Sequence, residues 1–164
     1  MRSARTGPRW DGRGIRIEIP GRRALALRQL VLDMNGTIAA GGEVLPGVAG
    51  RVARLARVLE VVVLTADTYG TAARAMAHLP LRLHPVSTGG DKARFVAGGR
   101  GVAAVGNGAN DVAMLRAADL GIAVLGREGT SAALLGAADV VVTRIEDALD
   151  LLLDPRRLVA TLRR

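Results

Sequence analysis

The sequence predicts an α/β fold: a parallel central sheet with helices on both faces in a Rossmann-like, three-layer arrangement, preceded by a β-hairpin. Three observations predict it. An apolar run at 30–32 leads into Asp33 and then turns through Asn35 and Gly36. Further short apolar runs follow, and segments of helical periodicity alternate with them. Strands that alternate with helices form parallel sheets.

The sequence predicts a β-hairpin first, followed by strands that alternate with helices. Residues 15–19 alternate between apolar and charged side chains, Pro20 and Gly21 turn the chain, and residues 24–28 alternate less regularly, which together indicate the hairpin. The remaining strands are expected at 30–32, 60–64, 81–86, 102–105, 120–124 and 140–142. Helices are expected at about 47–59, from Thr68 or Thr71 to about 79, around Lys92 to Val96, and at about 112–118, 131–137 and 145–153. Pro155 should end the last helix and leave 156–164 as a short basic helix or tail.

Composition excludes several kinds of chemistry. The chain has no cysteine, which excludes disulfides, thiolate metal sites and a cysteine nucleophile and is typical of a reducing cytoplasm. No apolar run approaches the roughly 18 to 20 residues that cross a bilayer, so no membrane partner is expected. The predicted location is the cytoplasm.

The net charge of +8 is concentrated at the start of the chain. Residues 1–28 contain eight arginines against Asp11 and Glu18, which gives +6, and the remaining residues give +2. We therefore expect a disordered basic arm at 1–13 and a single domain at 14–164. One Trp, one Tyr and one Phe leave little to stack on bases, so nucleic acid is not the expected partner. A nucleic-acid-binding or scaffold role for the arm is the weaker alternative.

Polar residues follow several of the predicted strands. Asp33, Thr65, Lys92 and the loop 106–111 all fall at strand ends or at the helix starts that come next. A carboxylate that attacks phosphorus needs a cation and hydrogen-bond donors for the phosphoryl oxygens. Asp33 would be the nucleophile, Thr65 and Lys92 would bind the oxygens, and Asp111 with Asp33 would hold a hard cation such as Mg²⁺. Lys92 is the only lysine among 23 basic residues, which suggests a place where a compact ammonium is needed.

These residues resemble the four motifs of the haloacid dehalogenase-like (HAD) superfamily, and in particular the phosphorylation domain of P-type ATPases and its membrane-free relatives. Asp33-Met34-Asn35-Gly36-Thr37 resembles the first motif, and Leu64-Thr65 resembles the second. Lys92 resembles the third motif, and the loop from Gly106 through Asn107 and Asn110 to Asp111 resembles the fourth. The resemblance implies a HAD fold and an aspartyl-phosphate at Asp33. It implies catalytic roles for Asp33, Asn35, Thr65 and Lys92, substrate binding by Gly36, Thr37, Thr65, Lys92 and Asn110, and Mg²⁺ binding by Asp33, Asn35, Asn107 and Asp111.

Two positions depart from the family pattern. Hydrolytic members have an aspartate where this chain has Asn35, and an amide cannot shuttle a proton, so turnover should be slow. The family usually places a metal-binding aspartate where this chain has Asn107, so Mg²⁺ should bind together with the phosphate rather than alone. The alternative is a weakly active or inactive phosphate-binding or phospho-acceptor domain that a partner protein reads.

The spacing of the motifs leaves no room for a cap domain. Only 27 residues separate Thr37 from Thr65 and 26 separate Thr65 from Lys92, and predicted elements fill both spans. The resemblance to capless members implies an open site that accepts a small phosphate ester or acyl phosphate. A neighbouring subunit of a homo-oligomer, or a large substrate, would then exclude water.

Each motif also has an ordinary structural explanation. A strand-end aspartate is often a helix cap, a strand threonine is often a core residue, and Asn-Gly is often a turn. The loop that begins Gly106-Asn107-Gly108 could be a dinucleotide loop, but Asp111 stands where that motif needs its third glycine. The order of four motifs on the expected elements is what favours the HAD interpretation.

Overall fold

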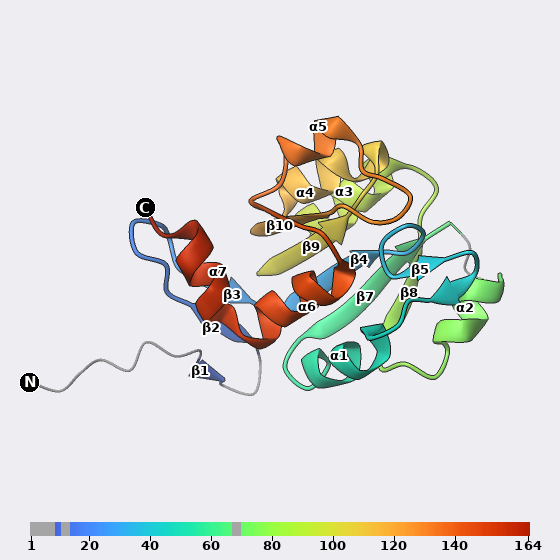
Figure 1. The fold of residues 1–164 in the computed structure, drawn as a ribbon, viewed down its shortest axis with the longest axis horizontal. Coiled ribbons are helices and arrows are strands. Elements are labelled where there is room, and N and C mark those ends of the chain that lie inside the picture. The colour runs from blue at the N-terminus through green and yellow to red at the C-terminus, as the bar shows by residue number, and fades with distance from the viewer. Residues whose placement is uncertain (1–8, 11–13, 67–69) are drawn as a thin grey trace, which may run out of the picture.

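A computed structural model describes residues 9–10, 14–66 and 70–164 (Figure 1). Most of the predicted basic arm at 1–13, and Thr68 as a candidate helix cap, lie outside the described residues. Arg9–Trp10, inside the predicted arm, form the short strand β1, which pairs antiparallel with β2 (Ile15–Ile17). The sequence did not predict this strand.

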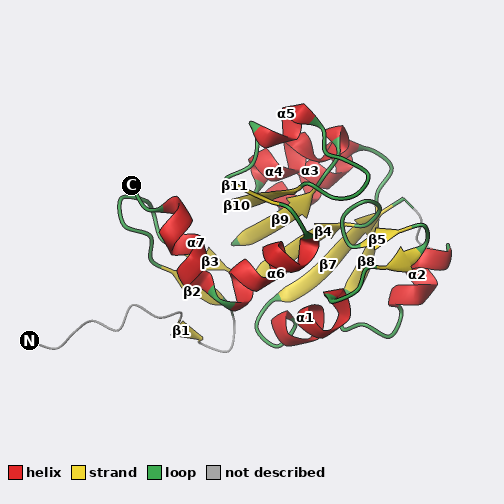
Figure 2. Cartoon of the chain, in the orientation of Figure 1, coloured by secondary structure: helices red, strands yellow, loops and turns green. Residues whose placement is uncertain are grey.

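A six-stranded parallel sheet forms the centre of the molecule, as predicted (Figure 2). Its strand order is β11-β10-β9-β4-β7-β8. The strands are β4 (Gln29–Asp33), β7 (Glu60–Thr65), β8 (Arg82–Pro85), β9 (Val102–Gly106), β10 (Leu120–Val124) and β11 (Val140–Val142). The central strand β4 is apolar over most of its length because it is covered on both faces.

Helices cover the two faces and give the predicted three layers. Leu30 and Leu32 of β4 belong to the core under α1 (Val48–Leu55), α6 (Ile145–Leu153) and α7 (Pro155–Leu162). Val31, whose side chain points to the opposite face, belongs to the core under α3 (Gly89–Ala97), α4 (Val112–Ala117) and α5 (Ala132–Leu135). Met76 of α2 (Thr71–Met76) joins the first core.

The predicted hairpin is confirmed, and some details differ from the prediction. Strands β2 and β3 (Leu25–Leu27) pair antiparallel. The loop before α1 contains a small hairpin, β5 (Ala39–Ala40) and β6 (Glu43–Val44), that the sequence did not reveal. Pro155 begins α7, where its missing N–H costs nothing, so of the two predicted alternatives for 156–164, a helix or a tail, the structure has the helix.

The topology creates a natural binding position. From β4 the chain adds β7 and β8 on one side of the sheet and then β9, β10 and β11 on the other. In such sheets ligands bind at the carboxyl ends of the strands where the order reverses, here β4 and β9. Asp33 ends β4, and Gly106 ends β9.

No helix in the described ranges is long and apolar enough to span a bilayer.

Candidate active site

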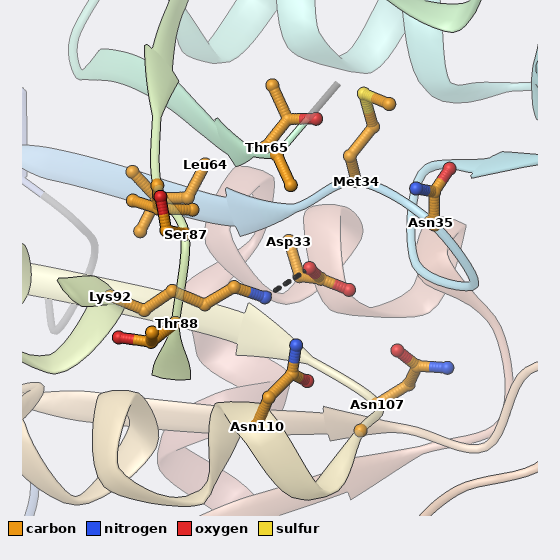
Figure 3. Close-up of a pocket in the computed structure, with 13 residues that line it drawn as sticks. Asp33, Met34, Asn35, Leu64, Thr65, Ser87, Thr88, Lys92, Asn107 and Asn110 are labelled. Atoms are coloured by element: carbon orange, nitrogen blue, oxygen red, sulfur yellow. Dashed lines mark hydrogen bonds and ion pairs between the residues drawn. The ribbon is translucent and has the colours of Figure 1, made fainter. Parts of the chain in front are cut away.

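A pocket of about 290 Å³ opens at this reversal point. Six of the nine predicted site residues line it: Asp33, Asn35, Thr65, Lys92, Asn107 and Asn110. Figure 3 shows Lys92 reaching Asp33 from one side, with Asn35 and Asn107 on the other side of the carboxylate. The structure therefore brings together residues from all four sequence motifs.

Asp33 lies at the floor of the pocket and is 8 % exposed. Its Oδ1 accepts a hydrogen bond from Lys92 Nζ at 2.6 Å, and its Oδ2 accepts one from Thr37 Oγ1 at 3.1 Å. Thr37 Oγ1 also lies 3.3 Å from Asn107 Oδ1, so it can donate to either acceptor. These contacts fix the orientation of the carboxylate toward the pocket.

Lys92 is held by the start of α3. Thr88 caps that helix: its Oγ1 accepts from the Asp91 N–H at 3.1 Å, while Asp91 Oδ2 accepts from the Thr88 N–H at 2.9 Å. This capping box satisfies N–H groups that have no partner within the helix. Hydrogen bonds from Ser87 and Thr88 also lower the pKa of Asp91. Lys92 follows directly, and its Nζ reaches the buried Asp111.

Asp111 is fully buried behind the pocket and does not line it. Its Oδ1 accepts from Lys92 Nζ at 2.7 Å, and its Oδ2 accepts from the N–H groups of Asn107 and Gly108, both at 3.1 Å. A β-carbon on Gly106 would lie 2.6 Å from Asp111 Cγ, so glycine is required where β9 passes this carboxyl group. Asp111 thus ties the fourth motif to Lys92.

The three charged groups influence each other strongly. Burial and the neighbouring Asp111 carboxylate raise the pKa of Asp33, and Lys92 only partly offsets them. Burial opposes the charged form of Lys92, but the Asp33 and Asp111 carboxylates together outweigh it and raise the pKa of the ammonium. With all three ionised, the cluster has one net negative charge, which opposes the approach of a phosphate unless a cation accompanies it.

Gly36 and Thr37 do not line the pocket, although the sequence predicted that they bind substrate. Gly36 has a φ of 77°, a conformation that favours glycine, and its N–H donates to Ala39 O at 2.8 Å. The Thr37 N–H faces Met34 O at 3.3 Å. Both amides are thus used within the turn, because the β5–β6 hairpin folds back on it.

Sequence reasoning missed other polar groups around the pocket. Ser87 and Thr88 line it beside Lys92. The exposed Glu128 lies close to the turn that follows Asp33, since a β-carbon on Gly36 would lie 2.9 Å from its Oε2. The loop that carries Glu128 is attached to the site by the Ser131 N–H, which donates to Asn107 O at 3.0 Å. Nothing local in the sequence marks Glu128, because it lies far along the chain from the other motifs.

The oxygen donors around the pocket suit a hard cation only in part. Among the described residues no group of three or more His, Cys, Asp or Glu side chains could hold a metal ion. Asp33, Asn35 and Asn107 line the same pocket with one carboxylate and two side-chain amides, while both oxygens of Asp111 already have donors. Mg²⁺ commonly binds through one or two carboxylates and completes its shell with substrate phosphate and water. This donor set therefore fits Mg²⁺ together with a phosphate.

Comparisons with known proteins place the fold among phosphatases and cation pumps. No family model and no curated protein matches the sequence. A cobalt-bound deoxy-D-mannose-octulosonate 8-phosphate phosphatase from Haemophilus influenzae is similar over 77 % of this chain and 87 % of its own, with 13 % identity and a TM-score of 0.64. A 3-deoxy-D-manno-octulosonate 8-phosphate phosphatase from Moraxella catarrhalis, in complex with magnesium, phosphate and KDO, is similar over 84 % of this chain and 94 % of its own. The two chains are 14 % identical, with a TM-score of 0.61.

The likeness to a P-type ATPase is closer in sequence. A zinc-transporting PIB-type ATPase in the E2.Pi state is 30 % identical over 72 % of this chain, with a TM-score of 0.58. The match covers only 20 % of that ATPase, so this chain corresponds to a small part of the pump.

Proposed function

Because this chain has the capless fold of the HAD superfamily, we propose that it is a Mg²⁺-dependent phosphohydrolase or phosphotransferase that acts through an aspartyl-phosphate at Asp33. The observation that carries the proposal is the position of Lys92 Nζ, 2.6 Å from Asp33 and 2.7 Å from Asp111, at the floor of an open polar pocket. A buried carboxylate held by an ammonium, with the hydroxyl-bearing Thr65 beside it, is a suitable nucleophile for phosphoryl transfer.

In the first step, Asp33 Oδ2 attacks phosphorus, the bond from phosphorus to the leaving oxygen breaks, and the leaving group departs with the electron pair. Oδ2 is the better candidate because Oδ1 is held by Lys92 and Oδ2 by a single hydroxyl. Ser87 and Thr88 line the pocket beside Lys92, Thr65 lines it near Met34, and their hydroxyl groups are candidates to donate to the phosphoryl oxygens. Lys92 counters the added negative charge without leaving its place.

In the second step, water attacks the phosphorus of the aspartyl-phosphate, which releases phosphate, regenerates the Asp33 carboxylate and gives a proton to solvent. Asn35 lines the pocket where the family has its acid–base aspartate. An amide can orient water or a leaving group by hydrogen bonding, but it cannot accept the proton. Since acid–base catalysis typically contributes about 10²- to 10⁴-fold, we expect slow turnover.

Asp33, Asn35 and Asn107 would hold Mg²⁺ and substrate phosphate together. The metal would neutralise the charge that otherwise opposes phosphate in this pocket. We assign Asp111 to a positioning role, because Lys92 and two backbone N–H groups already satisfy its oxygens. Asn110, at the exposed edge of the pocket, would contact the part of the substrate beyond the phosphate.

The amide at position 35 favours substrates with good leaving groups. Without an acid at position 35, an acyl phosphate can depart unprotonated more easily than an ester of an ordinary alcohol. We propose a small phosphate ester or acyl phosphate as substrate, with a neighbouring subunit covering the pocket during the reaction.

The test is phosphorylation by acetyl phosphate, with and without Mg²⁺, followed by intact-mass measurement. We expect one phosphoryl mass, dependent on Mg²⁺ and located at Asp33. Asp33→Asn should remain unlabelled, and Asp147→Asn, which changes a carboxylate on α6, should be labelled like the parent protein. Equal labelling of Asp33→Asn would overturn the assignment of the nucleophile.

The second candidate is a phospho-acceptor domain that a partner reads, and the amides at Asn35 and Asn107 favour it. The same experiment separates the two candidates by the lifetime of the label. Release of phosphate over repeated cycles supports the enzyme, whereas a stable label without released phosphate supports the phospho-acceptor.

A further inference from the structure

A second pocket, of about 360 Å³, lies at the other end of the sheet. Its lining comes from the β2–β3 turn, from β3 and Arg28 after it, from the turn between α3 and β9, and from the turn between α4 and β10. These segments flank the amino ends of β4 and β9, whereas Asp33 stands at the carboxyl end of β4. Five strand residues span about 16 Å, so the two pockets are separate.

The second pocket is lined by four arginines and one acid. They are Arg22, Arg23, Arg28, Arg100 and Asp119. Three of these arginines come from the basic segment 1–28, and the fold adds Arg100 from a distant part of the chain to the same hollow. Guanidinium groups that face one hollow repel each other unless an anion lies between them.

Most of this positive charge is available to a ligand. Arg22 pairs with Asp139 at 3.2 Å, and Asp119 Oδ2 is used by the Val102 N–H at 2.8 Å. Within the described ranges, the side chains of Arg23, Arg28 and Arg100 have neither an ion pair nor a hydrogen bond.

The backbone around these arginines is well held. Gly101 O accepts from the N–H groups of Arg28 and Gln29 at 2.7 and 3.1 Å, which attaches the start of β4 to the turn that carries Arg100. Arg28 O in turn accepts from the Glu60 N–H at 3.0 Å. The arginine side chains therefore extend from fixed positions, which lowers the entropy cost of binding.

We propose that this basic pocket binds an oligophosphate group, meaning two or three linked phosphates. Planar guanidiniums match phosphate oxygens with paired hydrogen bonds, and several phosphates are needed to occupy three arginines that pair with no other described residue. The other described lining residues are Ala24, Leu25, Ala26 and Gly101, which offer no aromatic ring or side-chain amide to recognise a base. The group can be a free inorganic oligophosphate or the end of a nucleoside triphosphate.

The test is calorimetric titration of the full chain with tripolyphosphate, a nucleoside triphosphate and a short single-stranded oligonucleotide, each without Mg²⁺. We expect tripolyphosphate to bind, with an affinity that falls as salt rises. If the nucleoside triphosphate binds as tightly as tripolyphosphate, the pocket recognises the triphosphate alone. Much tighter binding of the nucleoside triphosphate would identify a nucleotide as the source of the oligophosphate group. Absence of tripolyphosphate binding, or a clear preference for the oligonucleotide, would overturn the proposal.

Two matched triple variants locate the site. Arg23→Gln/Arg28→Gln/Arg100→Gln should weaken tripolyphosphate binding by at least about tenfold. Arg54→Gln/Arg57→Gln/Arg116→Gln removes the same charge from exposed positions elsewhere and should change binding by less than about twofold. Equal losses in both would indicate non-specific attraction and overturn the proposal. If the first triple variant fails to fold, Arg23→Gln and Arg100→Gln singly must each weaken binding.

This proposal is independent of the proposed function. Asp33→Asn should bind tripolyphosphate as the parent protein does, and the pocket triple variant should still be labelled at Asp33 by acetyl phosphate. Loss of tripolyphosphate binding in Asp33→Asn would place the anion in the first pocket and overturn the second site.

Discussion

At the scale of single residues, the pocket is defined by what stands beside Asp33. Lys92 contributes a compact charge between two carboxylates, and Asn35 and Asn107 contribute amides where the family has acids. The first feature supports formation of an aspartyl-phosphate, and the second should slow its hydrolysis. The rate of labelling and the lifetime of the label can therefore be changed separately.

Asn35→Asp should shorten the lifetime of the phosphorylated protein. The new carboxylate could accept a proton from the attacking water, so we expect loss of the label to accelerate by about 10²-fold or more. The lifetime is measured by intact mass after acetyl phosphate is removed. An unchanged lifetime would mean that residue 35 does not face the attacking water.

Lys92→Arg should slow labelling by at least about tenfold, although it keeps the charge. The ammonium lies within 2.7 Å of both carboxylates in a nearly closed space, and a longer planar group would extend into the place of the phosphate. The initial labelling rate is the measurement. A rate equal to that of the parent protein would show that no compact ammonium is required.

At the scale of elements, the position of each functional side chain depends on how its helix or strand begins and ends. Lys92 depends on the capping box of α3, and Asp111 depends on the short 3₁₀ turn η1 (Ala109–Asp111), where its carboxylate accepts from N–H groups of the preceding loop. These are local structures, yet they determine distances between motifs that are far apart in the sequence.

Thr88→Ala should destabilise the protein by about 1 kcal/mol and slow labelling at Asp33, because the first turn of α3 loses its cap. Thermal unfolding and the labelling rate check the two effects. Ser131→Ala is the control, since Ser131 precedes α5 without a side-chain cap and should change both values less. Equal effects from the two variants would contradict a special role for the α3 cap.

Asp150→Asn should lower the melting temperature at neutral pH, because Asp150 joins α6 to α1 through two hydrogen bonds from Arg51, at 2.8 and 3.0 Å. These hydrogen bonds lower the pKa of Asp150. A lowered folded-state pKa stabilises the protein above the ordinary carboxyl pKa, and this stabilisation is lost as pH falls through the folded-state value. The difference from the parent protein should therefore shrink as the pH falls below the ordinary carboxyl pKa.

The matched control for that measurement is Asp147→Asn, which removes a carboxylate whose ion pair with Arg144 stays at the start of α6. It should lower the melting temperature less at neutral pH. A difference for Asp150→Asn that persists undiminished in acid would show that the ion pair is not its cause.

At the scale of the whole molecule, two positively charged regions must be considered separately from the site at Asp33. One is the arginine-rich start of the chain, and the other is the pocket at the amino ends of the strands. Among the described residues, neither region contributes to the lining of the pocket around Asp33.

Deletion of residues 1–8 should leave labelling at Asp33 unchanged within about twofold, because none of the four sequence motifs lies in this segment and salt screens long-range charge effects. Strand β1 begins after the deletion and keeps its pairing partner. Labelling kinetics at physiological salt are the measurement. A large loss of labelling would mean that the arm takes part in phosphate chemistry.

The strands were predicted well from sequence because buried parallel strands are continuous apolar runs between turn residues. The predictions at 60–64, 120–124 and 140–142 agree with β7, β10 and β11 to within a residue. The β5–β6 hairpin was missed because its strands have only two residues each and show no periodicity. The helix predicted at 47–59 ends at Leu55, since the apolar residues after it pack from turns.

Periodicity and turn chemistry are local properties, so the sequence alone predicts the layered parallel fold and the set of groups at the ends of its strands. The contacts that each group makes there depend on the folded chain. In the folded chain both oxygens of Asp111 accept hydrogen bonds from Lys92 and from backbone N–H groups, and the Gly36 N–H donates within a turn. The fold also gathers four arginines into a hollow at the far end of the sheet. These outcomes depend on distances between residues remote in the chain, which no local pattern encodes.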